Sequence, residues 1–391
     1  MQRKKKNDDC GCNGMKYTAL KDVCEINMGQ SPDSSSYNGD GRGIPFFQGN
    51  ADFGDRNPVT RVWCDAPTKI ANKNDILISV RAPIGAVNYA TETCCIGRGL
   101  ASITPDLNRV SSDYIFWLLK GKNAELNSKG TGSTFKAINR KALEEIQVLD
   151  ISLEEQAAYA ANLETVYRVI QMQNQQLSTL DDLIKARFVE MFGDPEIGVC
   201  KYPLNRLGDL AIKISDGVHA KPEYTEEGKP FLSVVNINKG VIDFTDCKYV
   251  SEEAYQKMIK STHPERGDVL YTKVGATYGI PAFVDTDREF CLYVSVCLIK
   301  PIHDKINSRF LAVQMAMPYI KHQADSRIKG IGVPDLHLNQ ISEFNIICPP
   351  RAEQDAFVSF IGQINKSKSA IQKSLGETQL LFDSLMQKYF G

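Results

Sequence analysis

Two long stretches of the chain carry apolar residues at alternating three- and four-residue steps. They cover residues 153–192 and 351–390, and neither contains a proline. Such steps place the apolar side chains on one narrow stripe of a helix, which is the pattern of a coiled-coil seam. In the first predicted helix the stripe comprises Leu163, Val166, Ile170, Leu177, Leu180, Ile184 and Met191. In the second it comprises Phe357, Ile361, Ile364, Ile371, Leu375, Phe382, Leu385 and Tyr389.

Local signals mark the start of both predicted helices. Ser152 and Glu155 have the spacing of a capping box, and Pro350 stands where proline is favoured at a helix start. Each helix could pack on its own globular domain, but a seam this long and narrow suits a partner helix better. We expect an antiparallel pair, because the first helix leads to a second domain and the second helix starts there. About 39 residues at ~1.5 Å per residue give a rod of roughly 60 Å.

The sequence around these helices repeats in order. Six segments recur: 20–23 and 207–210, 43–47 and 228–232, 74–79 and 267–272, 130–132 and 330–332, 155–156 and 353–354, and 192–193 and 390–391. A repeat of nearly half the chain indicates two tandem modules rather than a solenoid of short units.

The part of each module outside the long helix combines short β-type runs with short amphipathic stretches. The β-type runs are separated by Gly, Pro, Asn and Asp, which predicts a loop-rich sheet in a compact α+β domain. The predicted fold class is α+β, with two similar globular domains in a pseudo-twofold arrangement, joined by two long helices in an antiparallel coiled coil. The predicted divisions are a disordered tail over 1–15, a globular domain over 16–150, a helix over 151–193, a second globular domain over 194–350 and a second helix over 351–391.

Composition limits the classes of protein that fit. Of the 391 residues, 42% are hydrophobic and 24% charged, which is ordinary for a globular protein. The 46 Lys and Arg against 47 Asp and Glu give no overall basic field, so nucleic-acid binding would need a local arrangement of charge. No apolar run approaches the ~20 residues of a membrane span. Because the polar start is unlike a signal peptide and the cysteines fit a reducing compartment, we expect a cytoplasmic protein.

The sequence offers little for metal or catalytic chemistry. None of the eleven cysteines forms a CxxC pair, and the five histidines are scattered. We therefore expect ordinary thiols and no metal site, with a metal or redox role of Cys10 and Cys12 as the minor alternative. A Walker lysine motif is absent, and Asn57-Pro58 and Asp194-Pro195 lack the second proline and the aromatic residue of a DNA adenine methyltransferase. We expect no catalytic activity.

Taken together, the ordered motifs resemble the specificity subunit of type I restriction–modification systems. The resemblance covers about residues 16–391. It rests on the Leu-x-Asp-Val/Leu start of each module, the Asp-Ile/Val-Leu strand, the Gly-x-Gly loop before Ile138 and Leu338, the Glu-Gln opening of each long helix, and the segment 188–195.

This resemblance implies a function. In that family the globular parts are target recognition domains, and the helices are spacers that dock modification (methyltransferase) subunits. The chain would then be a non-catalytic guide on double-stranded DNA, with each domain recognising one half of a bipartite asymmetric target. It would bind no cofactor itself, since S-adenosylmethionine belongs to the modification subunits, of which we expect two; restriction (endonuclease/translocase) subunits are further expected partners. The alternative is a coiled-coil protein scaffold without DNA recognition.

Candidate DNA contacts lie in loops that carry cationic, amide or hydroxyl side chains, which suit phosphates and base edges. Ordinary surface turns are the alternative for all of them. Arg81 and Lys273 follow matching strands, Tyr278 and His219 are weaker candidates, and the amides Gln48 and Asn50 match Asn236 and Asn238 approximately. The remaining candidates lie in or beside the two Gly-x-Gly segments: Lys129, Thr131, Ser133, Lys136, Arg327 and Lys329.

Overall fold

The computed structural model describes residues 16–131, 136–328 and 332–391. The predicted tail over 1–15 lies outside these residues. The chain divides into two compact units, which we call unit 1 (Met1–Asn174 with Lys373–Gly391) and unit 2 (Gln175–Gln372). Each unit holds one globular part and half of each long helix, so the units group residues differently from the predicted domains, whose boundaries stay a prediction.

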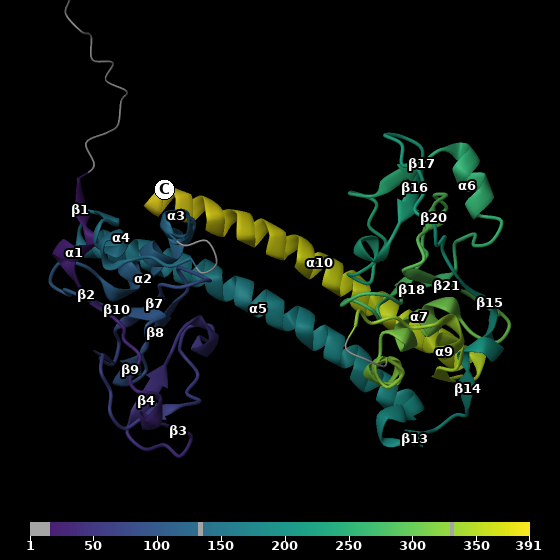
Figure 1. The fold of residues 1–391 in the computed structure, drawn as a ribbon, viewed down its shortest axis with the longest axis horizontal. Coiled ribbons are helices and arrows are strands. Elements are labelled where there is room, and N and C mark those ends of the chain that lie inside the picture. Colours follow the sequence, from purple (N-terminus) through teal and green to yellow (C-terminus); the bar gives the residue numbers. More distant parts are fainter. Residues whose placement is uncertain (1–15, 132–135, 329–331) are drawn as a thin grey trace, which may run out of the picture. The chain divides into compact units, whose positions relative to one another are not determined.

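Unit 1 contains a four-stranded antiparallel sheet in the order β2-β10-β7-β8 and a five-stranded sheet in the order β3-β5-β4-β9-β6 (Figure 1). Its strands are β1 (Tyr17–Ala19), β2 (Cys24–Met28), β3 (Tyr37–Asn38), β4 (Ile44–Phe47), β5 (Trp63–Cys64), β6 (Ile70–Ala71), β7 (Ile76–Ser79), β8 (Val87–Tyr89), β9 (Cys94–Ile96), β10 (Leu100–Pro105) and β11 (Gln147–Leu149). Its short helices are α1 (Leu20–Val23), α2 (Ser112–Gly121), α3 (Asn123–Lys129) and α4 (Arg140–Glu144).

Unit 2 repeats the main features of this topology. Its four-stranded sheet has the order β15-β21-β18-β19, a three-stranded sheet has the order β17-β16-β20, and β14 pairs with β22 as β1 pairs with β11. The strands are β12 (Gly193–Asp194), β13 (Val199–Cys200), β14 (Leu204–Arg206), β15 (Ala211–Asp216), β16 (Lys229–Leu232), β17 (Lys248–Val250), β18 (Val269–Thr272), β19 (Pro281–Phe283), β20 (Cys291–Leu292), β21 (Val296–Pro301) and β22 (Asn345–Ile347). The short helices are α6 (Glu252–Met258), α7 (Ser308–Met315), α8 (Pro318–Asp325) and α9 (Leu338–Ser342). The predicted α+β class and the tandem repeat are confirmed.

The long helices have the predicted bounds, α5 over Leu153–Phe192 and α10 over Arg351–Phe390. The capping box is present, because the Glu155 carboxylate accepts a hydrogen bond from the Ser152 backbone N–H at 3.0 Å, and the Glu155 N–H donates to the Ser152 hydroxyl at 3.2 Å. Two of the four orphan donors at the helix start are thereby satisfied.

Within unit 1 the start of α5 packs on the end of α10. Asn162 donates a hydrogen bond to the Tyr389 hydroxyl at 3.1 Å, and Gln173 donates to the Ser374 hydroxyl at 2.9 Å. Residue numbers rise along α5 as they fall along α10, so this pair is antiparallel. All predicted seam residues in this unit are buried or half-buried: Leu163, Val166, Ile170, Leu375, Phe382, Leu385 and Tyr389.

Within unit 2 the end of α5 packs on the start of α10, also antiparallel. Lys368 donates to Asp181 at 2.6 Å, and the rings of Phe188 and Phe357 lie 5.7 Å apart between centroids. The predicted seam residues are again buried or half-buried: Leu177, Leu180, Ile184, Met191, Phe357, Ile361, Ile364 and Ile371. Pairing of helices and packing on the globular parts therefore occur together, because several seam side chains belong to the main cores of the units.

The repeated Glu-Gln pair has a structural task in each unit. The buried Gln156 amide oxygen accepts the backbone N–H of Ser111, the N-cap of α2, at 2.7 Å. The buried Gln354 amide accepts the N–H of Asn307, the N-cap of α7, at the same distance. Each glutamine fixes a short helix against a long one, which explains why the pair occurs twice.

The repeated Phe-Gly pair closes each core. Phe390 is the last residue of α10, and its ring centroid lies 5.4 Å from that of Tyr114 in α2. Phe192 is the last residue of α5, and its ring centroid lies 5.2 Å from that of Phe310 in α7. Gly193 follows Phe192 with a φ of +88°, and a Cβ there would meet the Val199 carbonyl oxygen at 2.2 Å. Only glycine allows the chain to turn directly behind the buried ring.

Candidate nucleic-acid interface

In unit 1 the loop after β7 meets the segment that follows α3. The backbone N–H of Ala82 donates to the Lys136 carbonyl at 3.2 Å, and Arg81 forms a β-bridge with Ala137. Thr131 and Ala137 exchange two backbone hydrogen bonds at 3.0 Å. Arg81, Thr131 and Lys136 are therefore brought together, and all three side chains are exposed.

Two other candidates belong to the same region of the sequence. Lys129 ends α3 and its ammonium lies 2.6 Å from the Glu125 carboxylate, one helical turn earlier. An exposed pair of this kind contributes little to stability and leaves the lysine able to exchange its partner. Ser133 lies outside the described residues.

Unit 2 repeats the meeting of these two segments. The N–H of Gly275 donates to the Pro334 carbonyl at 2.9 Å, and Val274 forms a β-bridge with Asp335. The same backbone scaffold thus carries different side chains in the two units. Lys329 lies outside the described residues.

Lys273 is buried rather than presented at the surface. Its side chain is 5% exposed, and its ammonium lies 3.5 Å from an Asp216 oxygen and 3.4 Å from an Asp335 oxygen. Lys273 and Arg81 both follow matching strands, but they do not occupy corresponding positions. The backbone N–H of Lys273 donates to the Ser295 carbonyl, just as the backbone N–H of Val80 donates to the Gly99 carbonyl. Lys273 therefore corresponds to Val80, and the next residue, Val274, corresponds to Arg81. A DNA contact by Lys273 stays a prediction, and in this structure its ammonium holds two carboxylates.

The remaining candidates of unit 2 near this loop also make internal contacts. The Tyr278 hydroxyl donates to Asp325, and the Lys321 ammonium lies 3.7 Å from the centre of the Tyr278 ring. The Arg327 guanidinium donates to the backbone carbonyls of Gln323 and Glu343 at 2.6 and 3.2 Å. Tyr278 and Arg327 are thus tied to the globular part, and their roles in DNA binding stay predictions.

The amide candidates do not occupy matching positions. Asn236 is buried and accepts the Ser233 N–H at 3.0 Å, as Asp52 accepts the Gly49 N–H at 3.3 Å. Asn236 therefore corresponds to Asp52 and caps a turn.

The other amides lie in more open positions. Asn50 begins the turn that Asp52 closes, and Asn238 follows the turn that contains Asn236. Gln48 is exposed and donates to the Ser31 hydroxyl at 2.9 Å.

Two positions in the loops after β2 and β15 correspond to each other. The backbone N–H of Gln30 donates to the Ile96 carbonyl, and the backbone N–H of Val218 donates to the Leu292 carbonyl in the same way. The residues that follow, Ser31 and His219, therefore correspond to each other. The side chain of His219 is 77% exposed, and its Nε2 lies 3.4 Å from an Asp216 oxygen.

Sequence reasoning missed Arg98 and the two carboxylates around Lys273. Arg98 is exposed on the turn between Gly97 and Gly99, and its backbone N–H donates to Ser31 at 3.2 Å. The glycines on both sides of Arg98 were the available signal. Asp216 and Asp335 gave no signal, because they lie far apart in the sequence.

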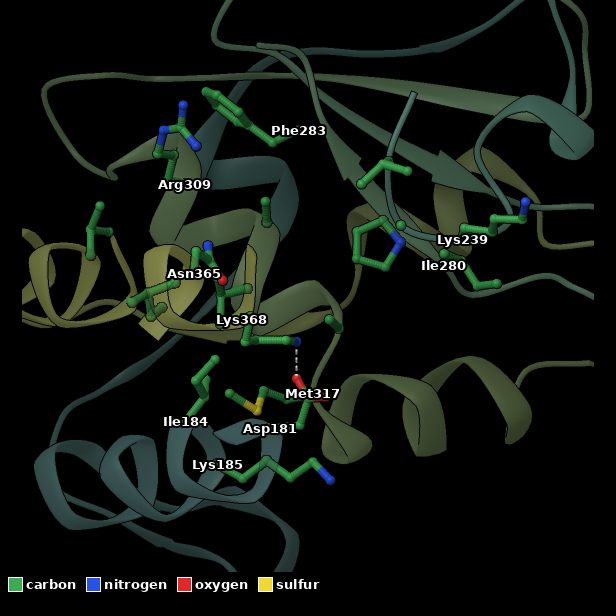
Figure 2. A pocket seen from close by; sticks show the side chains of 18 of the residues that line it. Asp181, Ile184, Lys185, Lys239, Ile280, Phe283, Arg309, Met317, Asn365 and Lys368 are labelled. Atoms are coloured by element: carbon green, nitrogen blue, oxygen red, sulfur yellow. Dashed lines mark hydrogen bonds and ion pairs between the residues drawn. The ribbon is translucent and has the colours of Figure 1, made fainter. Parts of the chain in front are cut away.

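A cavity of about 1030 Å³ opens in unit 2 beside the long helices. Figure 2 shows Ile184 and Lys185 of α5, Asn365 and Lys368 of α10, and Phe283 and Arg309 around this space. The candidate Asn238 also lines it. Four basic residues and one carboxylate contribute to the lining: Lys185, Lys239, Arg309, Lys368 and Asp181.

The corresponding space in unit 1 is filled. Counted from their matching N-caps, Phe116 and Trp117 of α2 stand where α7 has Ala312 and Val313. The Arg56 guanidinium lies 4.3 Å from the centre of the Phe116 ring and forms an ion pair with Glu164 of α5. The residue of α10 that corresponds to Glu164 is Gly362, which has no side chain. The two units therefore differ in their side chains on the same backbone frame.

Lys120 belongs to the filled space of unit 1. Its ammonium lies 3.9 Å from the centre of the Tyr167 ring. Burial, with the nearby Arg56 guanidinium, lowers the pKa of Lys120 to about 8. The carboxylates of Asp55 and Glu164 act in the opposite direction and raise this pKa.

Neither a metal centre nor a membrane span is found in the part of the chain that the structure describes. No three His, Cys, Asp or Glu side chains gather there as a metal ion would require. None of the described helices is both long enough and apolar enough to cross a bilayer. Cys10 and Cys12 lie outside this part.

The sequence profile described as type I restriction modification DNA specificity domain matches residues 13–181 and 204–378. The putative type I restriction enzyme MjaX specificity subunit of Methanocaldococcus jannaschii is 41% identical over 157 residues, which are 40% of this chain and 37% of that protein. The type I restriction enzyme MjaIX specificity subunit of the same organism is 24% identical over 94% of this chain and 91% of that protein.

The S subunit of a type I restriction-modification system from M. genitalium has a similar structure. Its match covers 99% of this chain and 98% of that chain, with a TM-score of 0.56 and 15% sequence identity, so it shows the fold alone. The resemblance drawn from the motifs is confirmed by the profile, which covers most of both modules. The chain therefore belongs to the family of the type I restriction modification DNA specificity domain.

Proposed function

We propose that this chain is the DNA sequence-recognition subunit of a type I restriction–modification complex, and that each globular part recognises one half of a bipartite, asymmetric target. One observation carries this proposal. The same meeting of a strand-end loop with a second segment occurs in both units, at Arg81 and Ala137 in unit 1 and at Val274 and Asp335 in unit 2. Two equal frames with unequal side chains suit two different half-sites.

The long helices are proposed to fix the spacing of the half-sites and to dock the modification subunits. In each unit the seam side chains face the partner helix or the core, yet large apolar side chains remain exposed on the helix surfaces. They are Leu153, Val169, Met172, Leu380 and Leu381 in unit 1 and Leu183 and Val189 in unit 2. Protein–protein contact sites are marked by contiguous exposed apolar patches, so these side chains are the proposed docking positions.

The chain is proposed to be non-catalytic. In a complete complex, two modification subunits would supply S-adenosylmethionine and the methyl transfer, and restriction subunits would supply cleavage. A near-neutral chain gains little from long-range attraction to DNA, so the partners would contribute much of the affinity.

The test is to produce this chain with the modification subunit of its own system in a host without that methylation, and to map the methylated bases. We expect a motif of two defined blocks separated by a gap of fixed length, present only when this chain is produced. In calorimetry the purified chain alone should bind no S-adenosylmethionine. The same methylation pattern without this chain would contradict the proposal. If double replacement of Arg81 and Lys136 by alanine left the motif and the extent of methylation unchanged, these two side chains would not contact DNA. A complex that forms with this chain but methylates without sequence preference would favour the scaffold alternative.

A further inference from the structure

The four-stranded sheets of the two units can be compared position by position, because their strand order and register agree. In unit 1, Ala101 of β10 pairs with Ile78 of β7 on one side and with Met28 of β2 on the other. In unit 2, Cys297 of β21 pairs in the same way with Tyr271 of β18 and with Asp216 of β15. On this face of the sheet unit 1 carries the apolar or side-chain-free residues Met28, Ile78, Val80, Gly99 and Ala101. The matching residues in unit 2 are Asp216, Tyr271, Lys273, Ser295 and Cys297.

The ammonium of Lys273 is the centre of this polar patch. It contacts Asp216, whose side chain is 16% exposed, and Asp335, whose side chain is 47% exposed. Asp335 corresponds to Ala137, since the two form matching β-bridges with Val274 and Arg81. An ammonium and two carboxylates thus replace Val80, Met28 and Ala137.

Stability alone gives no reason for this replacement. Burying charges costs free energy that an ion pair recovers only with good geometry, and apolar residues of similar size often do as well or better. Unit 1 builds the same sheet with apolar residues at these positions. Retention of three charges in unit 2 therefore points to a task other than folding.

The hydrogen bonding of the patch is incomplete in the free chain. The buried hydroxyls of Tyr271 and Ser295 have no partner among the described residues. The Lys273 ammonium offers three donors, and its two carboxylate contacts at 3.4 and 3.5 Å are long for charged hydrogen bonds. Native proteins leave few buried polar groups unsatisfied, and those that remain often mark a place for water or a ligand.

The patch lies beneath the loops proposed to recognise DNA. Asp216 ends β15, Lys273 follows β18, and Asp335 lies in the segment that meets the loop after β18 through the Gly275–Pro334 hydrogen bond of 2.9 Å. Asp335 is the exposed end of the ionic cluster, and Lys273 is its buried support. A carboxylate there would be repelled by phosphates, so it needs a donor on a base.

We propose that Asp335, held in place by Lys273, accepts a hydrogen bond from the exocyclic amino group of a base in the half-site that unit 2 recognises. Carboxylates accept from the cytosine N4 amino group in the major groove, and the adenine N6 amino group offers the same chemistry. Ala137 cannot make this contact, so the requirement is absent from the other half-site. This inference rests on the proposed function and names one position within it.

Two sets of variants test the proposal by methylation mapping with the modification subunit. The single variants Asp335→Ala and Asp335→Asn alter the exposed member of the cluster, and thermal unfolding of each variant checks that it folds. The triple variant Asp216→Met/Lys273→Val/Asp335→Ala installs the residues of unit 1 and removes every charge of the cluster. Asp304→Ala, on the exposed turn before α7, is the control for loss of a surface carboxylate.

We expect wild type and Asp304→Ala to give the same motif. Asp335→Ala and the triple variant should lose preference at one position of one half-site, by roughly tenfold to a hundredfold, while the other half-site stays unchanged. Asp335→Asn keeps one acceptor oxygen and should lose less. The base preferred there by wild type identifies the amino group as that of cytosine or adenine. Lys273→Met, which keeps Asp335 but removes its support, should weaken the same preference.

Other outcomes would contradict the inference, and a different outcome would contradict the proposed function on which it rests. If the triple variant folds and keeps the full wild-type motif, the cluster takes no part in recognition and the inference is wrong. The inference also fails if Asp335→Ala folds and keeps that preference. If even the wild-type complex gives no sequence-specific methylation, the proposed function itself fails.

Discussion

The ammonium of Lys368 on α10 donates a hydrogen bond to the carboxylate of Asp181 on α5 across a distance of 2.6 Å. Lys368 is a polar residue in the spacing of the seam, four residues after Ile364 and three before Ile371. Its side chain is 22% exposed, so the stem packs between the helices while the charged end reaches its partner. The pair fixes which turns of the two helices lie opposite each other in unit 2.

The seam should tolerate polar residues that find a partner and reject an unpaired charge. Ile170 is 6% exposed within the core of unit 1, so Ile170→Asp should lower the free energy of unfolding by about 3–5 kcal/mol, because it buries an unpaired charge. Ile371→Asp should cost less, because Ile371 is half-buried. Lys368→Met is the control and should change stability by about 1 kcal/mol or less. Thermal unfolding measures all three, and wild-type behaviour of Ile170→Asp would mean that the helices do not pair as described.

The filled and open spaces of the two units predict opposite effects of one exchange. Trp117 is fully buried, so Trp117→Val should cost about 3 kcal/mol or more through the cavity it creates. At the matching position, Val313→Trp adds a ring beside a cavity of about 1030 Å³ and should be neutral or stabilise by up to about 2 kcal/mol. Denaturant unfolding compares the two. A large loss of stability in Val313→Trp would show that the cavity cannot accept the ring.

Lys120 should make stability depend on pH in an alkaline window. Burial, with Arg56 second, lowers its pKa to about 8 in the folded chain, whereas an unfolded lysine titrates near ~10.4. Between these values the unfolded chain binds more protons, so the contribution of Lys120 to stability rises with pH. The melting temperature of wild type minus that of Lys120→Met should therefore increase from pH 7 to pH 9.5. A constant difference would contradict the lowered pKa.

The helices should transmit spacing without affecting sequence preference. Inserting seven residues in α5 after Gln175 and seven in α10 after Gln372 keeps the period of the seam and lengthens both helices by about 10 Å. We expect the gap of the methylated motif to grow by about three base pairs at ~3.4 Å each, with both half-sites unchanged. Altered half-sites, or an unchanged gap, would separate the helices from the spacing function.

Much of the helical part of the fold followed from local sequence patterns. A seam with a fixed period, a capping box at Ser152 and Glu155 and an uninterrupted run to Phe192 define a helix without reference to the rest of the chain. The repeat itself predicted that two similar globular parts would occur. These features depend on neighbours within a few turns, which is why they could be predicted.

The interface depended on contacts between distant segments and was predicted less well. Lys273 and Arg81 both follow a matching strand, yet one residue of register places Lys273 on the buried face and leaves Arg81 exposed. Asp335 lies 62 residues from Lys273, and nothing local indicated their contact. Side-chain direction at a strand end and pairing across loops are decided by tertiary structure.

The most direct test of two separable recognition parts is an exchange of residues 201–350 for the matching domain of another member of the family. Methylation mapping in cells that also produce the modification subunit would report the two half-sites and the gap together. The proposed function predicts that one half-site changes to that of the donor protein, while the other half-site and the gap length stay as in wild type. A continuous single-block motif, or an exchange that rewrites both half-sites at once, would contradict it.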